Sequence, residues 1–152
     1  MRNIGVDSLA LVSDVFSRAG LEISGPDDQS LSLSSPTAHY TCDVGNSDVC
    51  QIRGSWRRTV SSPEDRKALL RFAAQCNRER VVPKAYTVPT AGGRAITLAA
   101  EVNTLSSAGL SEEQFYGCVD SAVTAIATLF ADAEKMLQLH PVQMGVVRDE
   151  GP

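Results

Sequence analysis

The sequence has few of the residues from which catalytic and metal sites are built. Among 152 residues there are two histidines, His39 and His140, and four cysteines that form no Cys-x-x-Cys pair. Zinc sites need closely spaced Cys and His ligands, and serine hydrolases need a motif such as Gly-x-Ser-x-Gly, which is missing. No Gly-Lys-Ser or Gly-Lys-Thr follows Gly92-Gly93, so a phosphate loop is excluded. We therefore expect no enzyme, no cofactor and no metal.

Long apolar runs are missing too. No stretch approaches the roughly 20 apolar residues of a membrane-spanning helix, and residues 1–7 lack the apolar segment of a signal peptide. We expect a cytoplasmic protein without membrane contact, in which the cysteines are small buried hydrophobic residues. Cys42 and Cys50 flank a turn and can face each other across a hairpin, so a disulfide between them remains the alternative.

Aromatic residues are scarce, at 5% of the chain, although 43% of it is hydrophobic. Leu, Val, Ile and Ala must therefore supply most of the core. A chain of this length fits one domain, which we place at residues 1–141. Residues 142–152 form a C-terminal tail, in which a short apolar run precedes a charged end.

The first half of the chain predicts one helix and three strands. Apolar residues at helical spacing predict a helix over residues 7–20, ended by Gly20. Strict alternation of apolar and polar residues then predicts strands over 29–35, 38–44 and 49–57. Such alternation is typical of an antiparallel sheet that is covered on one face.

The second half predicts two helices around a hairpin. Ser62 is a suitable N-cap before Pro63, which predicts a helix ending near residue 80. Strands over 84–89 and 94–105 are joined by a glycine turn. The Ser111-Glu112-Glu113-Gln114 sequence is a capping box that begins a helix reaching about residue 140, before Pro141. The whole order is α-β-β-β-α-β-β-α, an α+β fold with a five-stranded antiparallel sheet.

The charges are unevenly distributed along the chain. Residues 53–94 contain ten Lys or Arg against three acidic residues, whereas the remainder contains four basic and fifteen acidic residues. A local balance of +7 against −11 can orient an acidic partner or a second copy. Nucleic-acid binding would also need exposed stacking aromatics, for which Trp56 and Tyr86 are the local candidates. Trp56 shares a strand face with Ile52, which favours core packing and disfavours nucleic acid.

Four short motifs together resemble the YbjN domain family. They are Trp56 at a strand end, Asn77-Arg78-Glu79 at a helix end, Lys84-Ala85-Tyr86 at a strand start, and the sequence from Ala108 to Gln114. The resemblance spans roughly residues 9–141. It implies a bacterial protein with a fold similar to that of type III secretion chaperones, which are small acidic homodimers that hold extended segments of client proteins. Some members of the family are proposed regulators.

These observations lead to three hypotheses. The first is a non-enzymatic, chaperone-like homodimer that binds a protein or peptide client at a sheet edge or in a groove. Its candidate contacts are Arg53, Trp56, Arg57, Asn77, Arg78 and Lys84. The second is a regulatory module that senses a small ligand or a nucleic acid through the basic segment 53–94. The third is a thiol-dependent enzyme, which predicts one fast-reacting cysteine.

Overall fold

The computed structural model describes residues 22–24, 30–46, 49–105 and 111–138. In chain order the elements are β1 (Glu22–Ser24), β2 (Ser30–Ser34), β3 (Ala38–Asn46), β4 (Val49–Trp56), α2 (Pro63–Glu79), β5 (Lys84–Pro89), the short 3₁₀ turn η1 (Ala91–Gly93), β6 (Ile96–Leu105) and α3 (Glu112–Met136). The helix predicted over residues 7–20 and the tail 142–152 lie outside these ranges.

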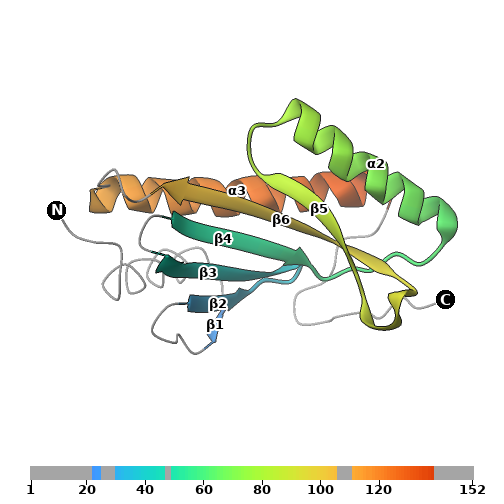
Figure 1. Cartoon of the computed structure of the whole chain (residues 1–152), viewed down its shortest axis with the longest axis horizontal. Coiled ribbons are helices and arrows are strands. Elements are labelled where there is room, and N and C mark those ends of the chain that lie inside the picture. Colours follow the sequence, from blue (N-terminus) through green and yellow to red (C-terminus); the bar gives the residue numbers. More distant parts are fainter. Residues whose placement is uncertain (1–21, 25–29, 47–48, 106–110, 139–152) are drawn as a thin grey trace.

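One antiparallel sheet contains every described strand, in the order β1-β2-β3-β4-β6-β5 (Figure 1). The α+β class and the five predicted strands are confirmed. The sheet has a sixth strand, β1, which the sequence analysis missed because three residues are too few to show alternation. β6 begins at Ile96, two residues later than predicted, because residues 91–94 are taken up by the turn. Gly92 and Gly93 adopt φ of 81° and 67° there, which glycine does without strain.

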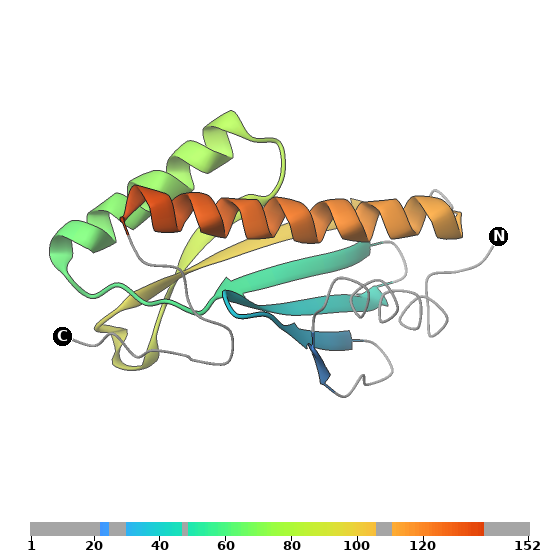
Figure 2. The same ribbon diagram turned by 180° about the vertical axis from the view of Figure 1, so that it is seen from behind.

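The two faces of the sheet differ as the alternation predicts. Leu33, Tyr40 and Ile52 are buried on the face that carries the hydrophobic core. Their sequence neighbours His39 and Arg53 are exposed on the opposite face. α3 lies along the core face and contacts β4 and β6, as the front and back views show (Figures 1 and 2). No helix within the described ranges is long and apolar enough to cross a membrane.

α2 forms where the sequence predicts it. The Ser62 hydroxyl accepts a hydrogen bond from the backbone N–H of Asp65, and Pro63 occupies the first turn. Leu69, Ala73 and Cys76 form the buried stripe of this helix, which packs against β5. Its last turn is tied to the sheet, since the Asn77 side chain both donates to the Ala85 carbonyl and accepts from the Ala85 N–H, each at 2.8 Å.

α3 begins with the predicted capping box, in which Ser111 and Gln114 exchange side-chain to backbone hydrogen bonds. The helix ends at Met136, four residues short of the predicted end. Two ion pairs hold its C-terminal part. Arg58 contacts Glu134 at 2.9 Å and Arg80 contacts Asp132 at 2.7 Å. The hydrogen bond to Asp132 raises the pKa of Arg80 above its ordinary value.

A close approach between α3 and β4 sets the position of the helix. A Cβ atom placed on Gly54 would lie 2.6 Å from Cγ2 of Ile126 and 3.2 Å from ring atoms of Phe130 and Tyr40. Carbon atoms in contact ordinarily sit about 3.5–4.0 Å apart, so only glycine fits beneath the helix at this point. The absence of a side chain at Gly54 therefore lets α3 pack directly on the strand.

Candidate functional site

β6 is longer than its neighbour β5, and this difference leaves part of β6 with a free edge. The register pairs Lys84 with Glu101, and β5 starts there. On its other side β6 continues to pair with β4 as far as Leu105. Residues 102–105 thus have a strand partner on one side and none among the described residues on the other. An unpaired strand edge presents backbone N–H and C=O groups to any chain that can lie beside it.

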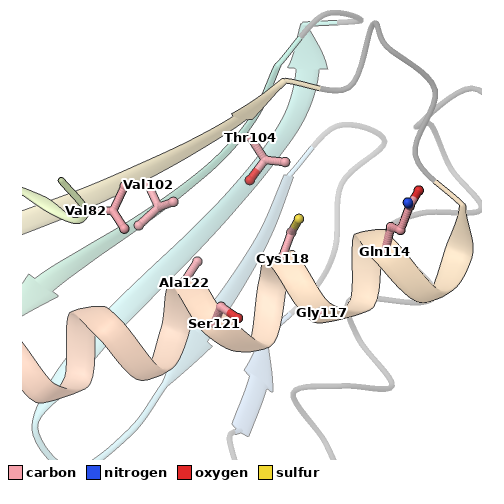
Figure 3. A pocket seen from close by; sticks show the side chains of 8 residues that line it. All are labelled: Val82, Val102, Thr104, Gln114, Gly117, Cys118, Ser121 and Ala122. Carbon is pink, nitrogen blue, oxygen red and sulfur yellow. The ribbon is translucent and has the colours of Figure 1, made fainter.

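A groove lies directly against this free edge. Its walls come from the end of β6, from the N-terminal half of α3 and from the loop between α2 and β5, and its volume is about 560 Å³ (Figure 3). The lining residues are Val82, Val102, Thr104, Gln114, Gly117, Cys118, Ser121 and Ala122. In Figure 3 Val102 and Thr104 point from β6 toward Cys118 and Ala122 on α3.

The groove is apolar with a few neutral polar groups, and it carries no charged side chain. Val82 at one end is 53% exposed, and its neighbour Val81 is 98% exposed. Exposed aliphatic side chains of this size are costly in water unless they meet a partner. The lining therefore suits the apolar side chains of a peptide better than a charged metabolite.

Two of the predicted contact residues are close in the sequence to Val82, which lines one end of the groove. Lys84 is exposed at the start of β5, and Arg78 is exposed in the last turn of α2. The Asn77 hydrogen bonds to Ala85 bring these two elements together at one corner of the sheet. Lys84 lies opposite Glu101 in the register of β5 and β6, so this corner carries the exposed basic side chains of Arg78 and Lys84 with one acidic residue beside them.

The remaining predicted contacts have other roles. Asn77 uses its amide on the backbone of Ala85, which makes it a structural clamp. Trp56 is 3% exposed, which confirms core packing and removes it as a surface anchor. Arg57 is partly buried, and its Nε atom has no hydrogen-bond partner among the described residues. Arg53 is exposed on the open face of the sheet, where it lies opposite Glu101, the residue that also faces Lys84 across β6 and β5.

Arg53 belongs to a polar cluster on the sheet face that the helices leave open. Its guanidinium lies 5.6 Å from the ring centre of Tyr86, and the Tyr86 hydroxyl donates to Glu101 at 3.3 Å. Burial raises the pKa of Tyr86, which keeps the hydroxyl protonated as a donor. Because Tyr86 is covered in this way, it is a poor platform for stacking a nucleic-acid base.

The cysteines are placed largely as expected. Cys42, Cys50 and Cys76 are buried, and burial raises the pKa of Cys76. The Cys42 and Cys50 sulfurs lie 3.7 Å apart across the β3–β4 hairpin as free thiols. The hydrogen bond between them raises the pKa of Cys42 well above its ordinary value. Cys118 was predicted to be buried like the other cysteines, but it is partly exposed in the groove.

Within the described ranges no three His, Cys, Asp or Glu side chains gather where a metal ion would need them. A groove or sheet edge was predicted as the place of binding, but neither its position nor its lining residues were. The signal that was available is the difference in length between the two hairpin strands, predicted as 84–89 and 94–105. Where one strand of a hairpin is longer than the other, its extra residues have no partner on that side.

The described residues form a small α+β domain in which a free strand edge lies beside an apolar groove. Comparison with known proteins gives the family. Residues 8–135 match the YbjN family model, described as "Putative bacterial sensory transduction regulator", and the chain belongs to that family. No curated protein matched the sequence.

Two solved structures resemble this one. The crystal structure of YbjN from E. coli, described as "a putative transcription regulator", has a TM-score of 0.67 at 16% identity, covering 88% of this chain and 93% of that one. An uncharacterized protein from Methanothermobacter thermautotrophicus has a TM-score of 0.49 at 12% identity, covering 84% of this chain and 97% of that one. The match to E. coli YbjN supports the fold.

Proposed function

We propose that this protein is a non-enzymatic regulatory domain of the cytoplasm that captures an extended segment of another protein. The observation that carries the proposal is the free edge of β6 over residues 102–105, with an apolar groove beside it. When an extended peptide adds a strand to a sheet edge, its backbone hydrogen bonds supply the affinity. Pockets for every second side chain supply the specificity. The family description is consistent with a regulator that acts through protein contacts.

A captured segment would continue the sheet where β5 stops. It would lie beside residues 102–105 and direct every second side chain into the groove, toward Cys118 and Ala122. The intervening side chains would point to the open, polar face of the sheet. The preferred ligand is therefore a segment in which apolar and polar residues alternate over four or five positions. This mode of binding resembles the capture of extended clients by type III secretion chaperones.

Selection from a displayed pool of random twelve-residue peptides tests this proposal. The full chain should enrich sequences with alternating apolar residues. A Cβ atom built on Gly117 has no other atom within 4 Å, so the larger side chain of Gly117→Phe can enter the groove without a clash. This variant should weaken binding of an enriched peptide at least tenfold. Thr124→Phe is the matched control, because Thr124 is exposed on α3 but does not line the groove. Failure to enrich any peptide, or equal binding by Gly117→Phe, would refute the proposal.

A second candidate function is nucleic-acid binding through the basic segment, and one observation favours it. Lys67, Arg71 and Arg78 fall within about 40° of one another around α2, where they form no ion pair with a described residue. Phosphate binding weakens steeply with salt, whereas binding of an apolar segment does not. Retention on DNA or RNA that disappears between low and physiological salt would support this function instead.

A further inference from the structure

The chain itself contains a segment with the chemistry that the groove requires. Val142, Met144 and Val146 occupy alternate positions, and Val147, Arg148, Asp149 and Glu150 follow them. We propose that the groove of one copy binds residues 142–150 of a second copy, so that the protein forms a dimer by reciprocal exchange of its tails. The proposal rests on the groove of the proposed function and makes the tail a competitor for any foreign segment.

The length of the segment matches the free edge. Four residues of β6, 102–105, lack a strand neighbour on the β5 side, and they span about 13 Å at strand spacing. Residues 142–146 span about 16 Å in the same conformation. Val102 and Thr104 are the two residues of this stretch that line the groove, so two of the three apolar side chains would enter beside them, and Gln143 and Gly145 would face the polar side.

The direction of binding follows from the sheet. Every described strand pair is antiparallel, and an antiparallel neighbour of β6 runs in the same direction as β5. The C-terminal end of such a segment arrives at Val82 and Lys84. Asp149 and Glu150, which follow Arg148, would then lie at the corner where Arg78 and Lys84 are exposed. In the reverse direction the acidic residues would meet the other end of the groove, where Glu113 is exposed beside Gln114.

The tail of the same copy cannot reach this position. Along α3 the nearest groove residue, Ala122, lies about 24 Å from Gln138, and Gln114 lies about 36 Å away. Met144 is six residues beyond Gln138 and reaches at most about 22 Å when fully extended. Val142 reaches less, and although Val146 reaches about 29 Å, the three residues cannot lie in the groove together. The alternating part of the segment can therefore fill the groove only when it comes from another copy.

Light scattering of the full chain at tens of micromolar, with charge-swapped variants, tests the exchange. The natural chain should be a dimer. Asp149→Lys with Glu150→Lys should raise the dimer dissociation constant about tenfold, as should Arg78→Glu with Lys84→Glu. All four changes together should return the dimer dissociation constant to that of the natural chain. Lys67→Glu with Arg94→Glu is the matched control for charge, since both residues are exposed away from this corner, and it should leave the dimer unchanged.

A mixing experiment separates exchange from any other dimer. Gly117→Phe blocks the groove and keeps the tail, whereas Met144→Asp with Val146→Asp spoils the tail and keeps the groove. Each variant alone should be monomeric, and their mixture should form a heterodimer with one exchanged tail. A monomeric natural chain, a dimer that the tail variants leave intact, or a mixture that does not associate would overturn the inference. Repeating the peptide selection with the Met144→Asp and Val146→Asp variant, whose groove no tail can fill, shows failure of the proposed function separately.

Discussion

Substitution of Gly54 by alanine tests whether α3 is seated on β4 as closely as the structure has it. The added Cβ would lie 2.6 Å from Cγ2 of Ile126, so the helix or the strand must move by about 1 Å to reach ordinary contact. Overpacking of this kind costs about 1–3 kcal/mol. Replacing a strand glycine recovers about 0.5–1 kcal/mol, because alanine loses less backbone entropy on folding. We expect a net loss of about 1–2 kcal/mol in the free energy of unfolding.

Urea unfolding followed by tryptophan fluorescence measures this loss, because Trp56 is the single tryptophan and is buried in the same core. Gly117→Ala is the opposite control. Gly117 is in the middle of a helix with open space around its Cβ, so alanine should stabilise the chain by about 0.5–1 kcal/mol. A Gly54→Ala variant as stable as the natural chain would refute the close packing of α3.

A double-mutant cycle assigns the loss to the contact. Ile126 is fully buried, so Ile126→Ala alone should cost about 2–5 kcal/mol. It also removes the Cγ2 atom that the new methyl group would strike. Adding Gly54→Ala in that background should therefore cost less than it does in the natural chain. Additive losses would place the effect of Gly54→Ala elsewhere.

Three further outcomes follow from the structure. Asn77→Ala should lower the free energy of unfolding by about 2 kcal/mol, because two hydrogen bonds to Ala85 are lost, and amide exchange at Ala85 should accelerate in the same variant. Burial raises the pKa of Tyr40 above its ordinary 10.0, so the folded state favours the neutral phenol and stability should fall as the pH rises above about 10. Tyr40→Phe should reduce that alkaline loss of thermal stability, and an unchanged loss would rule out Tyr40 as its source. A thiol reagent should label Cys118 in the native protein before the three buried cysteines, and equal rates for all four would contradict its exposure in the groove.

The sequence predicted the elements whose signals are local. The Ser62 cap, the capping box at Ser111 and the alternation of β2, β3 and β4 are all present, since each depends on residues a few positions apart. The turn at Gly92 is equally local. These features were enough to recover the α+β class and the order of the predicted elements that the structure describes.

Features that depend on contacts between distant residues could not be predicted in the same way. The groove exists because β5 ends its pairing at Glu101 while α3 returns over the same edge, more than ten residues later in the chain. The placement of Arg58 opposite Glu134 likewise joins residues 76 positions apart. Asn77 was predicted as a partner contact because its motif is conspicuous, whereas its amide is needed by the backbone of Ala85.

The two ends of α3 are held to the rest of the domain by different kinds of contact. Arg58 and Arg80 fasten the helix at Glu134 and Asp132, near its C-terminus. The opposite half, which carries Cys118, is retained by side-chain packing such as that of Phe115 and Val119. A strand added beside residues 102–105 would therefore meet the half of the helix that lies farthest from both charge contacts.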